Sequence, residues 1–270
     1  MPIVLRYLER KGGNAMPCLT IAIANQKGGV AKTTTVSELG ELLSQQYHKK
    51  VLMIDIDPQA SLTSIKGDMN DIIINNRKTM SNVMLRQSSI DEIVIPIKTN
   101  LYLAPATLVL SDVELNIINA TLRELILKAA LNSMLGSYDF VLIDCPPSRG
   151  LLTVNALSAS DYVLIPIQAE YQALLGLQLL KNTVANVQSQ INKELKVWGY
   201  VVTMTTRTNQ SSDTLNEIKK DHYPILSTIP RSTKVSDAGV ANMSTYEFDT
   251  NNPAGSAYLK LSEKLIGLEM

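Results

Sequence analysis

A short glycine-rich turn follows the first apolar segment of the chain and opens a helical segment. Residues 24–34 read Ala-Asn-Gln-Lys-Gly-Gly-Val-Ala-Lys-Thr-Thr, directly after the apolar run Cys18–Ala24. Backbone N–H groups of such a turn point inward, and the helix N-terminus adds a partial positive charge at the same place. The sequence therefore predicts a phosphate-binding loop. Its expected lining comprises Lys27, Gly28, Gly29, Val30, Ala31, Lys32, Thr33 and Thr34.

The loop departs from the usual pattern G-x-x-x-x-G-K-[ST] at two positions, which Gln26 and Ala31 occupy. Lys32 is expected to reach the β- and γ-phosphates of a nucleotide, and the Thr33 hydroxyl is expected to contact Mg²⁺. A second lysine, Lys27, stands at the start of the loop and can project outward. Because the Ala31 methyl group must fit beside the triphosphate, we expect a negative φ there and continued nucleotide binding.

Short apolar runs alternate with longer helical patterns along the chain. Several runs are apolar at consecutive positions, which is typical of strands buried on both faces of a parallel sheet. The pattern predicts an α/β, doubly wound, mostly parallel sheet. The predicted strands are 19–24, 51–55, 101–104, 140–144, 162–166, 197–203 and 225–229, and the predicted helices are 33–46, 112–135 and 174–191. Residues 61–100 are predicted to hold loops and insertions.

We expect one P-loop ATPase domain over residues 17–270, preceded by a flexible basic arm over residues 1–16. With 270 residues and 45% hydrophobic content, the chain can form a sizeable core. Its two cysteines, Cys18 and Cys145, lie in apolar runs and do not form a metal-ligand cluster. This pattern favours a reducing cytoplasm. No apolar run approaches the length of a membrane span.

Two aspartates fall where predicted strands end, and ligands of open α/β sheets bind at that edge. Asp144 follows the apolar run Phe-Val-Leu-Ile, and Asp57 lies just past another strand, before Pro58. An aspartate at the end of a buried strand, downstream of a phosphate loop, is typical of a carboxylate that holds Mg²⁺. We therefore assign the metal to Asp144 together with Thr33. Asp57 is expected to orient or deprotonate the attacking water.

The two-lysine loop resembles the deviant Walker A motif of the ParA/MinD/nitrogenase-iron-protein group of ATPases. Further segments resemble the ParA/Soj branch of partition ATPases, and together they span roughly residues 18–265. They are Asp55-Ile-Asp57-Pro-Gln, Asp144-Cys-Pro-Pro-Ser, the stretch 165–177, Thr206-Arg207-Thr-Asn209 and the stretch 229–238.

This resemblance implies that ATP joins two subunits face to face with the nucleotides between them. Lys27 would then contact the partner's nucleotide, Asp57 would act on the water, and Pro230 would belong to the nucleotide site. Lys27, Lys32 and Asp57 are thus the expected catalytic residues, and ATP and Mg²⁺ the expected cofactors. The resemblance also implies plasmid or chromosome partition by a homodimer, with slow hydrolysis that a ParB-type centromere-binding protein stimulates.

Bulk charge gives no argument for nucleic acid, because Lys+Arg and Asp+Glu both number 25. Binding to DNA would need a local basic patch. The resemblance places Arg207 and Arg231 on a face that binds DNA without sequence preference, and Lys234 lies beside them. It implies a cytoplasmic, nucleoid-associated protein that does not bind membranes. Other basic candidates in the last third are Lys219, Lys220, Lys260 and Lys264.

The alternative is a MinD-like positioning ATPase on a membrane, which would need a C-terminal amphipathic helix with a basic polar face. Residues 256–270 carry an apolar stripe at Tyr258, Leu261, Leu265 and Leu268, but Glu263 and Glu269 interrupt the basic face. This mixture favours packing on the protein's own core. An iron–sulfur reductase is disfavoured, since neither cysteine is placed to hold a cluster. A metabolic ligase or kinase has no supporting motif.

Overall fold

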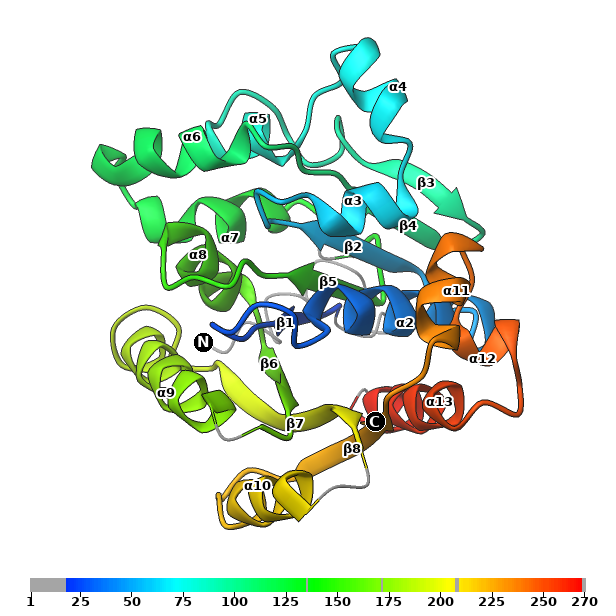
Figure 1. The fold of residues 1–270 in the computed structure, drawn as a ribbon. Helices are drawn as coiled ribbons and strands as arrows, with labels where there is room; N and C mark the ends of the chain where they lie inside the picture. Colours follow the sequence, from blue (N-terminus) through cyan, green and yellow to red (C-terminus); the bar gives the residue numbers. More distant parts are fainter. Residues whose placement is uncertain (1–17, 135, 171, 207–208, 269–270) are drawn as a thin grey trace.

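The computed structural model describes residues 18–134, 136–170, 172–206 and 209–268. Within these residues eight strands form one sheet (Figure 1). The strands are β1 Leu19–Ile23, β2 Val51–Asp55, β3 Ile95–Lys98, β4 Leu101–Ala104, β5 Phe140–Asp144, β6 Tyr162–Gln168, β7 Lys196–Thr205 and β8 Ile225–Pro230. They lie in the order β3-β4-β2-β5-β1-β6-β7-β8, and all neighbours are parallel except β3 and β4. The predicted α/β, mostly parallel sheet is confirmed.

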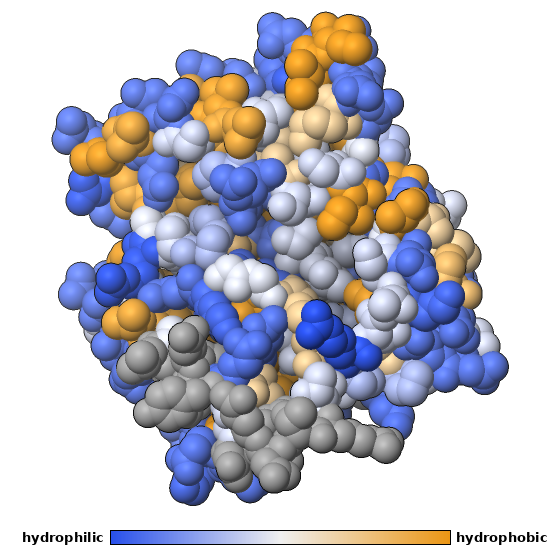
Figure 2. Space-filling model, viewed as in Figure 1, coloured by the Kyte–Doolittle hydropathy of each residue, from blue (hydrophilic) through white to orange (hydrophobic). Residues whose placement is uncertain are grey.

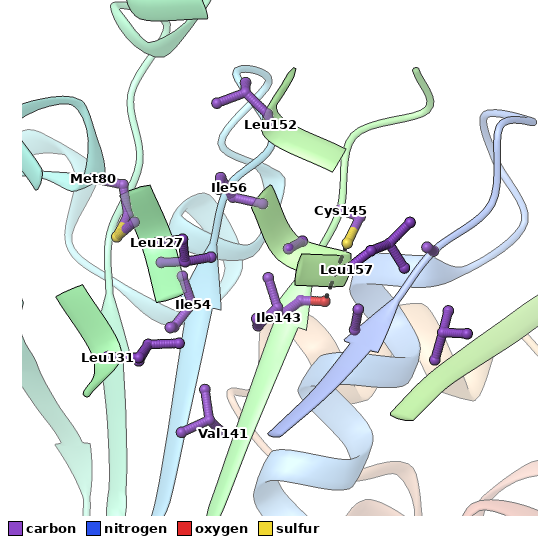
Figure 3. Packing of buried hydrophobic residues seen from close by; sticks show 14 of the residues in the cluster. Ile54, Ile56, Met80, Leu127, Leu131, Val141, Ile143, Cys145, Leu152 and Leu157 are labelled. Carbon is purple, nitrogen blue, oxygen red and sulfur yellow. Dashed lines mark hydrogen bonds between the residues drawn. The ribbon is translucent and has the colours of Figure 1, made fainter. Parts of the chain in front are cut away.

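Successive residues of the central strands pack on opposite faces of the sheet, which explains why these strands read as continuous apolar runs. In β5, Val141 and Ile143 join one buried cluster, whereas Phe140 and Leu142 join the other. Helices α7 Ile126–Leu131, α8 Leu151–Ala159 and α9 Gln172–Gln190 cover the first face, where Leu131 and Leu157 approach β2 and β5 (Figure 3). Helices α2 Lys32–Gln45 and α13 Pro253–Ile266 cover the second face (Figure 1).

The region 61–100 is more regular than its polar composition predicted. It contains α3 Ser61–Lys66, α4 Met69–Ile74, α5 Met80–Met84 and strand β3. The two residues between β3 and β4 close an antiparallel hairpin, in which Asn100 takes a left-handed φ of 63°. Pro96 lies in β3, where an edge strand can accommodate a residue without a backbone N–H. The interpretation of this region as loops was therefore wrong in part.

The predicted continuous helix over 112–135 was also wrong. The chain instead forms α6 Leu110–Asn116, two short 3₁₀ turns at Ile117–Asn119 and Arg123–Leu125, and then α7. Leu122 adopts a left-handed φ of 53°, which a continuing right-handed helix cannot include. Apolar spacing continues across this break, so the pattern alone could not reveal it.

The C-terminal helix α13 packs on the protein's own sheet, as expected. Tyr258, Leu261 and Leu265 are buried in the second cluster, and Leu268 packs against it. The Asn252 side chain caps the helix by accepting from the backbone N–H of Ala254, and Pro253 follows at the first turn. The remaining helices are α10 Asn209–Lys219, α11 Lys234–Val240 and α12 Thr245–Phe248.

Among the described residues, no helix has the length and apolar character that a membrane span requires. The viewed face is largely polar, and apolar side chains gather over α4 and α6 (Figure 2). They include Ile73, Ile74 and Leu115, which are 63%, 79% and 68% exposed. Residues 1–16, proposed from the sequence as a flexible arm, lie outside the described part of the chain.

Candidate active site

The strand ends of β1, β2 and β5 place the predicted site residues at one edge of the sheet. Asp144 is level with Ile23 on β1 and with Asp55 on β2 in the parallel register. The phosphate loop, defined here as residues 25–33, begins two residues after Ile23 and leads into α2. Backbone pairing therefore brings the loop, Asp55 and Asp144 together, although they are far apart in sequence.

Hydrogen bonds within the phosphate loop and to neighbouring strands hold it in shape. The Asn25 amide donates to the Pro166 carbonyl at 2.6 Å, and its oxygen accepts from the Lys27 N–H at 3.0 Å. The Thr203 hydroxyl donates to the Val30 carbonyl at 3.1 Å. Gly28 and Gly29 are exposed, and a Cβ added at either would meet no atom within 4 Å. The loop thus leaves an open side on which a phosphate can approach the backbone.

Lys32 is buried, and its ammonium group donates to the Lys27 carbonyl at 3.3 Å. Burial lowers its pKa, and the nearby carboxylates of Asp144 and Asp57 oppose that decrease. The side chain is therefore positioned at the bottom of the loop as a cation that faces the acidic strand ends. Thr33 and Thr34 follow it at the first turn of α2, and both are half-buried.

Lys27 lies near the start of the loop and is partly exposed. Its ammonium group forms an ion pair with Glu170 at 2.5 Å and donates to the Gln168 side-chain oxygen at 3.2 Å. The Lys27 side chain is 25% exposed and that of Glu170 is 57% exposed. The two loop lysines therefore differ in surroundings: one is enclosed by the site, and the other is accessible from outside.

Asp144 is fully buried, and neither of its carboxylate oxygens has a hydrogen-bond partner of good geometry among the described residues. Burial raises the pKa of this carboxyl well above its ordinary value, as does the neighbouring Asp55. The Thr33 hydroxyl and the Lys32 ammonium oppose part of the rise. Burying a carboxylate without hydrogen-bond partners costs free energy. These oxygens therefore fit a site to which a bound ligand brings a cation.

Asp57 and Asp55 share one turn but have different surroundings. The Asp57 carboxylate accepts from the Gln59 N–H at 2.9 Å, in the turn that leads into α3. Asp55 is completely buried and accepts from the backbone N–H and the hydroxyl of Thr63, at 2.8 and 2.7 Å. Burial raises the pKa of Asp55 to about 6. Asp55 thus anchors the start of α3. Asp57, in contrast, keeps a small accessible surface, with 8% of the residue exposed.

The expectation of a negative φ at Ala31 was wrong. Ala31 adopts φ 65° and ψ 35°, which is the left-handed region, and its carbonyl accepts the first helical hydrogen bond from Thr35 at 2.9 Å. Helix α2 starts directly from this residue, so the loop geometry that glycine usually provides is kept with an alanine. The methyl group makes this conformation unfavourable by about 1 kcal/mol.

A pocket of about 510 Å³ adjoins the loop, between α2 and the ends of β7 and β8. Thr34 and Ala31 line one side of it, and Met204 and Pro230 line another. We call it the base pocket, after the role proposed for it below. Pro230, which the resemblance assigns to the nucleotide site, is among the residues that line this pocket. Ten of its other lining residues come from α2, α3, α11 and the segment after β8: Ser37, Glu38, Ser64, Ile65, Arg231, Ser232, Val235, Ser236, Gly239 and Val240.

Two of the three predicted DNA-binding residues, Arg231 and Lys234, lie in the segment that follows β8. Arg231 is exposed at the rim of the base pocket, and its backbone N–H donates to the Thr205 carbonyl at 3.1 Å. Lys234 begins α11, forms an ion pair with Asp237 at 3.5 Å and lies 5.5 Å from the centre of the Phe248 ring. Arg207 lies outside the described residues.

Sequence reasoning assigned no role to several polar residues that shape the loop. Asn25, Gln168, Glu170 and Thr203 contact it directly, and Thr63 holds Asp55. Two of them had a signal that could have been used. Gln168 and Thr203 lie at the carboxyl ends of strands that flank β1 on one side, where ligands of such sheets bind. Without a sheet order, however, nothing in the sequence indicates which strand ends are neighbours.

Comparison with known proteins agrees with this geometry. The family model described as "AAA domain" matches residues 18–197. The sporulation initiation inhibitor protein Soj of Bacillus subtilis is 38% identical over 250 residues, which cover 91% of this chain and 97% of that protein. The chain belongs to the ParA/Soj family of partition ATPases. It is therefore an ATPase of the chromosome- and plasmid-partition type.

Solved structures similar to this ParA/Soj chain include nucleotide complexes. A plasmid partition protein of Borrelia burgdorferi bound to AMPPNP is 30% identical with a TM-score of 0.78, covering 93% of this chain and 99% of that one. Cobyrinic acid a,c-diamide synthase of Mycobacterium smegmatis, bound to an ATP analogue and magnesium, is 32% identical with a TM-score of 0.79, covering 92% and 94%. Proteins of this fold thus bind ATP analogues, one of them together with magnesium.

Proposed function

We propose that this chain is an ATP-driven dimeric switch that binds DNA without sequence preference and moves a plasmid or chromosome with a ParB-type partner. The observation that carries the proposal is the separation of the two loop lysines. Lys32 is enclosed against Asp144, whereas the Lys27 ammonium group lies at the rim, held by Glu170. One loop thus offers one cation to its own nucleotide and a second cation to a nucleotide in a facing subunit.

The residues fit a magnesium nucleotide. The two unpartnered oxygens of Asp144 and the hydroxyl of Thr33 would hold Mg²⁺. The ion would supply positive charge to the β- and γ-phosphates. The open backbone of Gly28 and Gly29 would take the phosphate oxygens, and Lys32 would contact them from below. The base pocket beside Pro230 would take the nucleoside.

Asp57 is suited to act on the attacking water. Its carboxylate lies at the start of α3, with one oxygen held by the Gln59 N–H. Asp55 and Thr63 fix the turn beneath it, since Thr63 also accepts from the backbone N–H of Ala106 at 2.9 Å. Among the described residues, no arginine forms a hydrogen bond or an ion pair with the loop, which supports slow unstimulated hydrolysis.

ATP would control DNA binding through dimerisation. The chain has no net charge, so one subunit offers only a small basic patch, with Arg231 and Lys234 as its described members. A two-fold dimer presents two copies of this patch, and each additional phosphate neutralised both tightens binding and steepens its salt dependence. In a cell, such a dimer would associate with the nucleoid and would leave it after hydrolysis.

Filter binding to plasmid DNA at several salt concentrations tests the proposal, with AMPPNP and with ADP as ligands. We expect binding with AMPPNP only, and a loss of about tenfold or more for Arg231→Glu, which removes one cation and adds one anion. Lys234→Glu should have a smaller effect, because Asp237 already neutralises part of its charge. Equal binding in both nucleotide states would contradict the proposal. Because Arg231 also lines the base pocket, AMPPNP affinity is measured for each variant.

A membrane-binding ATPase is the competing function, and the packing of α13 argues against it. A helix that lies on a membrane needs its apolar face free. In α13 that face is buried, with Tyr258 at 1% exposure and Leu261 and Leu265 at 0%. Retention of the protein on anionic liposomes with AMPPNP, but not on DNA, would favour the membrane function instead.

A further inference from the structure

Gln168 ends β6, and its side-chain amide contacts three different parts of the site. The nitrogen Nε2 donates to the Gly29 carbonyl at 2.9 Å and to the Met204 sulfur at 3.3 Å. The oxygen Oε1 accepts from the Lys27 ammonium group at 3.2 Å. The opposite amide orientation would place an N–H group against the ammonium and an oxygen against a carbonyl, so these partners fix the orientation.

Met204, on the other side of this amide, lines the base pocket. It lies in an irregular part of the β7–β8 pairing, where the register shifts between Val202 and Thr205. Its φ of 51° is in the left-handed region, which is uncommon for a residue with a long side chain. Such a conformation persists where the surroundings require it, and it is concentrated at functional sites. Here it places Met204 so that the residue lines the pocket and its sulfur contacts Gln168.

Lys27, on the remaining side, has one other partner among the contacts described, which is Glu170 at 2.5 Å. The Glu170 carboxylate is more than half exposed, so water and salt screen this ion pair, and a ligand can replace it at little cost. The contact with Gln168 is less accessible to water, because Gln168 is half-buried whereas Glu170 is exposed. The Gln168 amide therefore contributes to holding the Lys27 ammonium group within its own subunit.

We propose that Gln168 is a positioning residue through which a purine base in the base pocket sets the orientation of Lys27. The inference rests on the proposed function, in which Lys27 contacts the nucleotide of the partner subunit. A base that enters the pocket displaces the Met204 thioether, and the amide loses its sulfur contact. Phosphates bound at the loop act on the same Gln168 amide, because its nitrogen donates to the Gly29 carbonyl. Once both contacts donated by Nε2 are lost, the amide is free to turn its oxygen away from Lys27, so both ends of the nucleotide promote dimerisation.

Two substitutions at Gln168 should act in opposite directions. Gln168→Leu removes the acceptor that holds Lys27, so dimerisation becomes tighter with a ligand that lacks a base. Gln168→Glu keeps an acceptor and adds a negative charge beside Lys27, so dimerisation becomes weaker with every ligand. A residue with a purely structural role would lower dimerisation in both variants. Met204→Ala interrupts the same connection from the pocket side and should behave like Gln168→Leu.

The test is the dimer dissociation constant from analytical ultracentrifugation, with Mg²⁺ and saturating AMPPNP or inorganic tripolyphosphate. Gln178→Leu on the exposed side of α9 is the matched control, and thermal unfolding checks that each variant is folded. In the unmodified protein we expect dimers about tenfold tighter with AMPPNP than with tripolyphosphate. That ratio should fall towards one in Gln168→Leu and in Met204→Ala.

The outcomes distinguish a failure of this inference from a failure of the proposed function on which it rests. If the unmodified protein stays monomeric with AMPPNP, the dimeric switch itself is wrong, and the inference fails with it. If it dimerises but the ratio is one, or the ratio is unchanged in both Gln168→Leu and Met204→Ala, only the role of Gln168 is overturned. Parallel weakening in Gln168→Leu and Gln168→Glu would also overturn it.

Discussion

The ammonium group of Lys32 donates a hydrogen bond to the backbone carbonyl of Lys27 at 3.3 Å. The two lysines are therefore joined through the backbone of one and the side chain of the other, while their charges point to different sides of the loop. Lys32 faces Asp144 and Asp57, whereas the Lys27 ammonium group contacts Glu170. This arrangement lets the two cations be tested separately.

Removing Lys32 should abolish nucleotide binding, whereas removing Lys27 should not. In Lys32→Ala the loop loses the cation at its base, so we expect ATP affinity to fall by about a hundredfold or more, in line with loss of a hydrogen-bonded charge. Lys27→Ala should bind ATP with nearly normal affinity yet fail to dimerise. Titration with a fluorescent ATP analogue measures the first effect and light scattering the second. Lys219→Ala, at an exposed position on α10, is the control.

Asp57→Ala should bind ATP and dimerise but stop before hydrolysis. The substitution removes the carboxylate proposed to act on the water and leaves Lys32 and Asp144 in place. The dimer should therefore accumulate with ATP itself, not only with AMPPNP. Size-exclusion chromatography with light scattering, together with phosphate release, measures this. A monomeric variant with undiminished turnover would show that Asp57 has another role.

Asp144→Asn should weaken catalysis and strengthen the fold. Both Asp144 oxygens are buried without good hydrogen bonds, so the carboxylate destabilises the nucleotide-free protein. We expect the free energy of unfolding to rise on the order of 1 kcal/mol, because the desolvated charge is removed. Mg²⁺-dependent hydrolysis should fall strongly, and addition of EDTA should no longer change the residual rate. Denaturant unfolding and phosphate release in the same buffer report both effects.

Ala31→Gly should stabilise the protein without loss of nucleotide binding. The left-handed φ of 65° costs alanine roughly 1 kcal/mol that glycine avoids, although glycine also gains freedom in the unfolded chain. A net gain of about 0.5 kcal/mol in the free energy of unfolding is expected from these opposing effects. Ala60 has a φ of 52° before α3, so Ala60→Gly provides a matched comparison outside the phosphate loop. Destabilisation by Ala31→Gly would show that the methyl group makes contacts that outweigh the strain.

Glu38 should make the stability of the protein depend on pH. Burial raises its pKa from 4.5 to about 7, and hydrogen bonds from Thr245 and the charge of Lys66 oppose the rise, while Glu41 adds to it. Because the folded state binds this proton more tightly, the stabilisation is present below pH 4.5 and is lost as the pH rises towards 7. The loss approaches roughly 3 kcal/mol.

Glu38→Gln should therefore unfold with a smaller decrease in stability between pH 5 and pH 8 than the unmodified protein, over the range set by the pKa near 7. Urea unfolding at each pH measures the difference. Glu217→Gln, on the exposed part of α10, should leave the pH dependence unchanged. A pH dependence that persists in Glu38→Gln would assign it to another buried carboxyl, such as Asp55.

The central sheet and the phosphate loop could be predicted because their signals are local. Apolar runs such as 51–55 and 140–144 coincide with β2 and β5, since strands buried on both faces need apolar residues at every position. The loop lysines and the aspartates at strand ends were identified from chemistry that requires those residue types. The positions where the backbone turns left-handed were harder to predict. Leu122 and Ala31 have a positive φ although neither is a glycine or an asparagine.

The contacts around Lys27 could not be predicted, because they depend on which strands are neighbours. Gln168 lies 141 positions from Lys27 and 36 from Met204, and only the placement of β6 between β1 and β7 brings the three together. Arg231 shows the same limit from another side. Its charge indicated a role in DNA binding, yet the fold also places Arg231 at the rim of the base pocket.

The register of β5 makes enzymatic activity a sensitive report of correct folding. Asp144 is level with Ile23 and Asp55 through backbone pairing on both sides. A slip of one residue would move it about 3.3 Å along the strand and turn its side chain to the opposite face. Such a chain could still bury a similar amount of apolar surface, because β5 is apolar on both faces. Its far-ultraviolet spectrum would look native, but it would hydrolyse nothing, so recovery of turnover after refolding measures register where spectroscopy cannot.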